Sequence, residues 1–209
     1  EVRTRGVDRP LPDGWGLLAP SALQYTKRAQ VPKQMDEGDI NDVVEDFVEA
    51  TRLAATAGFE ALIVDMAHGY LLGSWLSPLT NRRPDHLDGS RLPGRRRPRA
   101  DRWCARAGGD VGGRTRFPLE LFSAVRAAWP EGRALGVSLS ATDWARGGTS
   151  VAESISTARL LADAGCDFIQ VFAGQTTSGG HPLYDPYYLV GYSDRIRNEV
   201  GVATIATGA

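Results

Sequence analysis

Short apolar runs alternate with amphipathic helical segments along this chain, and this alternation limits the fold more than any other feature. The apolar runs cover residues 61–64, 134–139, 167–172 and 202–206. Such an order is typical of parallel βαβ units, in which a helix connects two neighbouring strands of one sheet. We therefore predict an α/β fold with four parallel strands. The first run is continuously apolar, which favours a strand that is buried on both faces.

Capping residues indicate where two of the helices begin. Asp36 is followed three residues later by Asp39, and Ser150 in the same way by Glu153. In such pairs each side chain bonds the backbone N–H of the other residue, which satisfies donors that a helix N-terminus leaves free. The four predicted helices cover residues 36–58, 118–129, 150–165 and 189–200.

Two architectures contain parallel βαβ units of this kind. One is a doubly wound open sheet and the other is a (β/α)8 barrel. Four strands cannot close a barrel, and a complete barrel typically needs about 250 residues. If the chain has the barrel architecture, its 209 residues form roughly half of a barrel.

Composition excludes several classes of protein. The chain is 42% hydrophobic and 23% charged, as is usual for a globular protein, and its net charge is −1. No global charge therefore suggests a nucleic-acid or anionic-membrane partner. No apolar run reaches the roughly 18 residues that a membrane span requires, so we expect no membrane association.

The chain start and the cysteines bear on its cellular setting. The sequence begins Glu1-Val2-Arg3, with no initiator methionine and no apolar signal region, so we expect that an upstream part is absent. There are two cysteines, and Cys166 falls where a buried strand is expected. A disulfide framework is therefore not predicted, and a reducing, cytoplasmic setting is.

Residues 91–113 break the βαβ pattern, because they are rich in arginine and glycine and have no apolar period. Three interpretations are open: a solvated loop, a stretch translated in a shifted reading frame, and a nucleic-acid-binding patch. We expect a poorly ordered segment away from the barrel mouth, since clustered like charges cannot offset the entropy of ordering.

The candidate functional residues follow the predicted strands, because active sites of parallel α/β folds lie at the C-terminal strand ends. Asp65, His68 and Tyr70 follow the first strand, and Gly69 allows close approach of a ligand or backbone. Asp65 and His68 lack a third ligand with suitable spacing, so no metal site is expected. Polar residues also follow the later strands, among them Ser138, Ser140, Thr142, Asp143 and Gln175. Chemistry alone indicates an α/β enzyme without naming its reaction.

Several joined motifs resemble the NADH:flavin oxidoreductase family, the Old Yellow Enzymes. The longest is Ala67-His68-Gly69-Tyr70-Leu71-Leu72, which runs into Leu76-Ser77-Pro78-Leu79-Thr80-Asn81-Arg82-Arg83. Others lie at residues 19–22, 57–59, 114–120, 139–144 and 174–176. Within the family, residues 17–23, 140–144 and 194–201 are most similar to the reductase part of bifunctional aryl-CoA enzymes, such as salicylyl-CoA 5-hydroxylase and aminobenzoyl-CoA monooxygenase/reductase.

The resemblance implies a partial (β/α)8 TIM barrel that holds strands four to seven of eight across residues 1–209. It also implies FMN at the C-terminal mouth, reduced by NAD(P)H, and hydride transfer from the flavin to an activated C=C bond. A histidine pair in the family binds the substrate oxygen. His68 matches its second member, and Tyr70 matches a tyrosine that lines the site and could supply a proton.

Two positions depart from the family pattern. Asp65 stands where many relatives have the first histidine of the pair, and an ionised aspartate can only accept hydrogen bonds. Its expected role is to orient His68. Ser138, the expected cofactor-binding residue, falls where the family has an arginine against the flavin.

Three functions remain open on this basis. The first is an FMN-dependent NAD(P)H oxidoreductase acting on an unsaturated carbonyl or an aryl-CoA-derived small molecule, with an upstream monooxygenase domain and a homo-oligomer both conceivable. The second is a catalytically incompetent fragment that does not bind FMN by itself, favoured by Asp65, Ser138 and the missing strands. A non-redox barrel enzyme such as an aldolase would explain the strand order but not the motif around His68.

Overall fold

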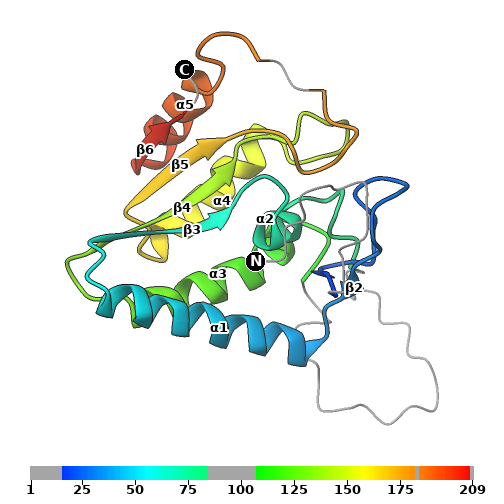
Figure 1. Cartoon of the computed structure of the whole chain (residues 1–209). Helices are drawn as coiled ribbons and strands as arrows, with labels where there is room; N and C mark the ends of the chain where they lie inside the picture. Colours follow the sequence, from blue (N-terminus) through cyan, green and yellow to red (C-terminus); the bar gives the residue numbers. More distant parts are fainter. Residues whose placement is uncertain (1–15, 84–106, 182–183, 208–209) are drawn as a thin grey trace.

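The structure is a computed structural model that describes residues 16–83, 107–181 and 184–207, and one parallel sheet forms its centre (Figure 1). The strands are β3 (Ala61–Met66), β4 (Ala134–Ser140), β5 (Phe168–Phe172) and β6 (Ala203–Ala206), and they lie side by side in that order. All three neighbouring pairs are parallel. The predicted set of four parallel strands is therefore confirmed.

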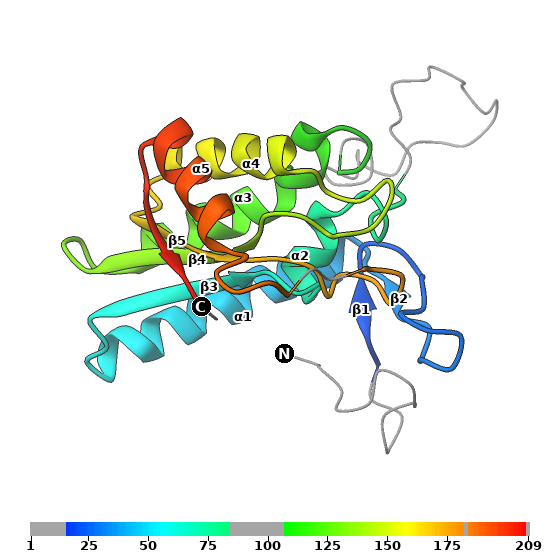
Figure 2. The same cartoon turned by 90° about the horizontal axis from the view of Figure 1, so that it is seen from above.

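A continuous layer of helices accompanies the sheet. It consists of α1 (Glu37–Thr56), α3 (Val111–Ala128), α4 (Val151–Asp163) and α5 (Val190–Val200). Each helix contacts the next one in this series, and α3, α4 and α5 lie together on one side of the strands in Figure 2. A short helix, α2 (Leu71–Leu76), follows β3 directly.

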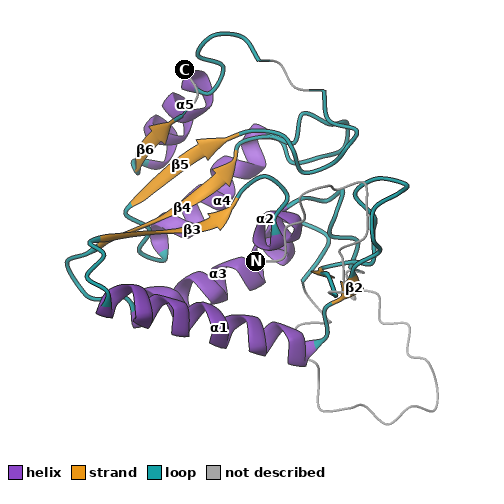
Figure 3. Cartoon of the chain, in the orientation of Figure 1, coloured by secondary structure: helices purple, strands orange, loops and turns teal. Residues whose placement is uncertain are grey.

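Only one face of the sheet is covered by this layer. Val64, Val137 and Ile169 point to the helices and are buried, whereas Ile63 and Ile205 on the opposite face are each 43% exposed. Figure 3 views the strands from that open face. The expectation that β3 is buried on both faces is therefore wrong. A doubly wound sheet carries helices on both faces, so the one-sided cover identifies a partial barrel.

The start of α3 differs from the prediction. The helix begins at Val111, where the Asp110 side chain accepts a hydrogen bond from the N–H of Gly113 at 2.8 Å, and Pro118 lies inside it. The sequence predicted a start at Pro118, because the glycines and arginines before it hide the helical period. The capping pairs at Asp36 and Ser150 are present as predicted.

The arginine-rich stretch is described only in part. Residues 84–106, which include Cys104, lie outside the described residues. The end of the stretch differs from the expectation of poor order, because Ala107 is fully buried and its carbonyl accepts from Asn81 Nδ2 at 2.7 Å. Cys166 is a free, buried thiol just before β5. Over the described ranges, no helix has the length and apolar character to cross a membrane.

The N-terminal segment forms a second, smaller layer. Strands β1 (Leu18–Ala19) and β2 (Lys33–Gln34) pair in parallel within a region that the sequence indicated as irregular. Arg83 anchors this segment from below, because its Nε donates to the carbonyl of Pro20 at 2.9 Å and its guanidinium lies 4.7 Å from the ring centroid of Trp75. The segment is therefore held beside α2.

Candidate functional site

Left-handed backbone conformations mark the C-terminal edge of the sheet. His68 (φ 57°) follows β3, Trp144 (φ 50°) follows β4 and Gln175 (φ 64°) follows β5. A side chain in this conformation costs about 1 kcal/mol or more, so it persists where surrounding contacts enforce it. Three such residues at one edge support the functional site predicted there. The sequence pointed to this edge, but nothing in it indicated these conformations.

The turn that carries His68 is held by the end of β4 and by the loop after β5. The His68 N–H donates to Ser140 Oγ, at the end of β4, at 3.1 Å. Gly69 also has positive φ (67°), and a Cβ atom on it would come within 2.7 Å of the Thr176 Cα, in the loop after β5. Only glycine allows this close approach, so Gly69 is needed both for the backbone turn and for its packing against Thr176.

Aromatic side chains surround the His68 ring. The Phe172 ring lies with its centroid 4.3 Å away, and the Tyr70 ring lies edge-on at 5.8 Å. Tyr70 is the residue that precedes α2. The predicted site residues His68 and Tyr70 thus lie together, whereas Phe172, the last residue of β5, was not among the candidates because it looks like an ordinary strand residue.

Asp65 and Ser138 are direct partners across the sheet. They face each other in the register of β3 and β4, and the Ser138 hydroxyl donates to Asp65 Oδ1. The same oxygen accepts from the N–H of Ala67 at 2.9 Å. Asp65 therefore makes its described hydrogen bonds to the base of the turn rather than to the His68 ring. It supports the position of His68 through the backbone.

A cleft of about 930 Å³ lies in front of these residues. Its walls come from the N-terminal segment, from α1, from both faces of the edge strand β3, and from the loop after β5. The side chains that carry its chemistry are Asp65, His68 and Tyr70, and Phe47 and Leu71 are among its apolar lining. The predicted site residues of β3 thus meet in one cavity.

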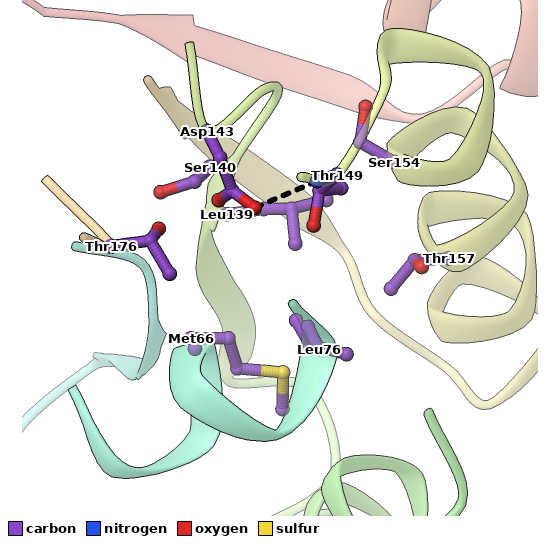
Figure 4. Close-up of a pocket in the computed structure, with 10 residues that line it drawn as sticks. Met66, Leu76, Leu139, Ser140, Asp143, Thr149, Ser154, Thr157 and Thr176 are labelled. Atoms are coloured by element: carbon purple, nitrogen blue, oxygen red, sulfur yellow. Dashed lines mark hydrogen bonds between the residues drawn. The ribbon is translucent and has the colours of Figure 1, made fainter. Parts of the chain in front are cut away.

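A small cavity of about 10 Å³ lies behind the turn, on the helix side of the sheet (Figure 4). Asp143 at its wall is 2% exposed and accepts hydrogen bonds from Ser77 Oγ and from the N–H of Thr149, each at 2.7 Å. The space is about that of one water molecule. Asp143 follows β4 as a predicted candidate, but its contacts show that it holds the loops together.

The described residues form part of a barrel with a cleft at the C-terminal ends of its strands, and comparisons with known proteins show what the chain is similar to. The model of the NADH:flavin oxidoreductase / NADH oxidase family matches residues 16–99. An NADPH dehydrogenase of Geobacillus sp. (strain WCH70) is 33% identical over 192 residues, which make up 92% of this chain and 50% of that protein. The chain is therefore similar in sequence to members of this family, in agreement with the resemblance of its motifs.

Solved structures support the same fold. Morphinone reductase matches with a TM-score of 0.65 and 25% identity, over 94% of this chain and 50% of its own. A complex of 2-naphthoyl-CoA reductase matches with a TM-score of 0.75 at 20% identity, over 91% of this chain and 27% of its own. The chain spans about half the length of the curated relatives it matches, which agrees with half of a barrel.

These relatives imply FMN and NAD(P)H as cofactors, and the cleft can be compared with what FMN requires. A phosphate group is usually bound by cationic side chains or by a helix N-terminus. The described lining of the cleft contains no lysine or arginine, and the Ser138 hydroxyl is committed to Asp65. The described residues therefore fit the substrate end of such a site but do not by themselves fit the FMN phosphate.

Proposed function

We propose that this chain forms the substrate-binding part of an FMN-dependent NAD(P)H oxidoreductase that reduces an unsaturated carbonyl compound or an aryl-CoA-derived substrate. The observation that carries the proposal is the His68 turn. A left-handed backbone, held by Ser140 and packed on Thr176, directs an imidazole to a large cleft at the strand ends. Such fixed geometry suits a group that must meet a substrate atom in one position.

In this proposal His68 donates a hydrogen bond to the carbonyl or phenolate oxygen of the substrate. Negative charge develops on that oxygen during reduction, and a fixed donor stabilises it. Tyr70 lies edge-on to the imidazole, where its hydroxyl would line the site and could supply a proton. Asp65 acts as a positioning residue, because it bonds the N–H of Ala67 next to His68.

The aryl-CoA branch is a finer proposal. It rests on the likeness of residues 17–23, 140–144 and 194–201 to the reductase part of the bifunctional enzymes. The same branch would place a monooxygenase domain upstream. Competition between an aryl-CoA thioester and the matching free aryl acid for the cleft tests it, since preference for the acid would contradict this branch.

Binding of 4-hydroxybenzaldehyde, followed by calorimetry, tests the role of His68. We expect His68→Ala to weaken this binding by about tenfold, the equivalent of one lost hydrogen bond. A melting curve of the same variant provides the control. A variant that binds normally but melts at a lower temperature would show that His68 has a structural role only.

A second candidate function is a fragment that does not bind FMN alone, which the absence of lysine and arginine from the described cleft lining favours. Titration of the chain with FMN, followed by flavin fluorescence, decides this point. Stoichiometric quenching at micromolar FMN would contradict the fragment interpretation. Absence of quenching, together with His68-dependent binding of 4-hydroxybenzaldehyde, would support a chain that contributes only the substrate end of the site.

A further inference from the structure

One oxygen of the Asp65 carboxylate is available to a ligand. Oδ1 accepts from Ser138 and from Ala67, whereas Oδ2 makes no hydrogen bond to any described part of the chain. The side chain is half-buried, belongs to the open face of the sheet and lines the cleft. A carboxylate can only accept hydrogen bonds. The group that meets Oδ2 must therefore be a donor.

The charged side chains that line the described part of the cleft are all negative, which also favours a hydrogen-bond donor with positive charge. Asp46 and Asp65 are both in its described lining, which includes no lysine or arginine. A cleft lined by one sign of charge concentrates ligands of the opposite sign. Its walls also carry aromatic rings, Phe47 and Tyr70 among them, and ring faces attract cationic nitrogen. The cleft therefore suits a cation with an apolar or aromatic body.

We propose that Asp65 sets the substrate class, by pairing with a protonated amino group of an aromatic substrate whose oxygen is bound by His68. The inference rests on the proposed function of His68. A histidine at position 65, as in many relatives, would present a second hydrogen-bond donor beside His68. Such a pair of donors would favour an anionic oxygen of the ligand. With Asp65, one donor and one acceptor meet it instead, so the same cleft selects a molecule that carries both an oxygen acceptor and a cationic donor.

Three para-substituted phenols test this inference, because they share the oxygen and differ in the charge of the substituent. They are 4-hydroxybenzylamine, 4-hydroxybenzyl alcohol and 4-hydroxybenzoate, and their binding to the chain is measured by calorimetry. We expect the amine to bind at least about tenfold more tightly than the alcohol, and the benzoate to bind most weakly. Equal affinities, or tightest binding of the benzoate, would overturn the inference.

Variants at Asp65 separate charge from shape. Asp65→Asn keeps the size of the side chain, and we expect it to remove the preference for the amine over the alcohol. Asp65→His should shift the preference toward the benzoate. The matched control is Asp42→Asn, an exposed position of α1 that does not line the cleft, which should retain the preference. A preference for the amine that survives Asp65→Asn would contradict the inference.

His68→Ala distinguishes this inference from the proposed function. It should weaken all three phenols equally and leave the order of their affinities intact. If His68→Ala changes none of them while Asp65→Asn removes the preference, the proposed role of His68 fails and the charge selection by Asp65 stands. If no phenol binds the wild-type chain at millimolar concentration, the inference about Asp65 is wrong.

Discussion

At the scale of single residues, the left-handed backbone of His68 carries a local cost in free energy that its surroundings must offset. Its positive φ is accompanied by a hydrogen bond from the His68 N–H to the end of β4 and by packing of the adjacent Gly69 on the loop after β5. Glycine adopts this conformation freely, whereas alanine pays about 1 kcal/mol or more. We therefore expect His68→Gly to be more stable than His68→Ala by about 1 kcal/mol in urea denaturation. Equal stabilities would indicate that the turn relaxes once the imidazole is removed.

Glu153 provides a pH-dependent contribution to stability. Its carboxylate caps α4 and meets Arg114 at 2.6 Å. Burial opposes its ionisation, but hydrogen bonds from Ser150 and Arg114 outweigh this effect and lower the pKa of Glu153 below its usual 4.5. A lowered pKa stabilises the fold above the pKa of the unfolded chain, and this stabilisation is lost as the pH falls through the folded value.

The prediction for Glu153→Gln follows from the lowered pKa of Glu153. We expect the free energy of unfolding of the variant to be about 1 kcal/mol lower than that of the wild type at neutral pH. The value is modest because the side chain is partly exposed. The difference should shrink as the pH becomes acidic, because the wild-type carboxyl is then protonated as well. Urea denaturation across this pH range measures it, and a constant difference would contradict the pKa shift.

At the scale of secondary-structure elements, α3 depends on a cap that the sequence alone did not indicate. The Asp110 carboxylate accepts from the N–H of Gly113 at the first turn. Replacing such a cap by alanine typically costs about 1 kcal/mol. We expect Asp110→Ala to lower the melting temperature, while Asp185→Ala, at an exposed position, should not. Equal melting temperatures for the two variants would argue against this cap.

Local signals explain which elements could be predicted. The capping pairs at Asp36 and Ser150 lie within a few residues of the helices they begin, and the strands are short and apolar, so their positions could be read directly. The start of α3 was hidden by glycines and arginines. The conformation of His68 depends on Ser140 and Thr176, which are distant in sequence. The exposure of Ile63 arises because none of the described segments covers that face of the sheet. Local patterns carry none of this information.

At the scale of the whole molecule, the open face of the sheet has a consequence for the isolated chain. Ile63 and Ile205 are exposed there, and parallel sheets rarely leave a face uncovered. We expect concentration-dependent self-association in sedimentation velocity, weakened by Ile205→Glu. The matched control is Leu53→Glu, because Leu53 is 61% exposed on α1. A chain that stays monomeric at high concentration, or equal effects of both variants, would contradict this expectation.

The order of the strands also determines the order in which the sheet can form during synthesis. Each strand from β4 to β6 pairs with the strand of this sheet that precedes it along the chain. A helix lies in each connection between them. A chain that leaves the ribosome N-terminus first can therefore add one strand and helix at a time to a finished edge, and domains generally fold as units during synthesis. Contacts between near neighbours in sequence also shorten the conformational search. From β4 onward, each strand of this sheet finds its first partner already made.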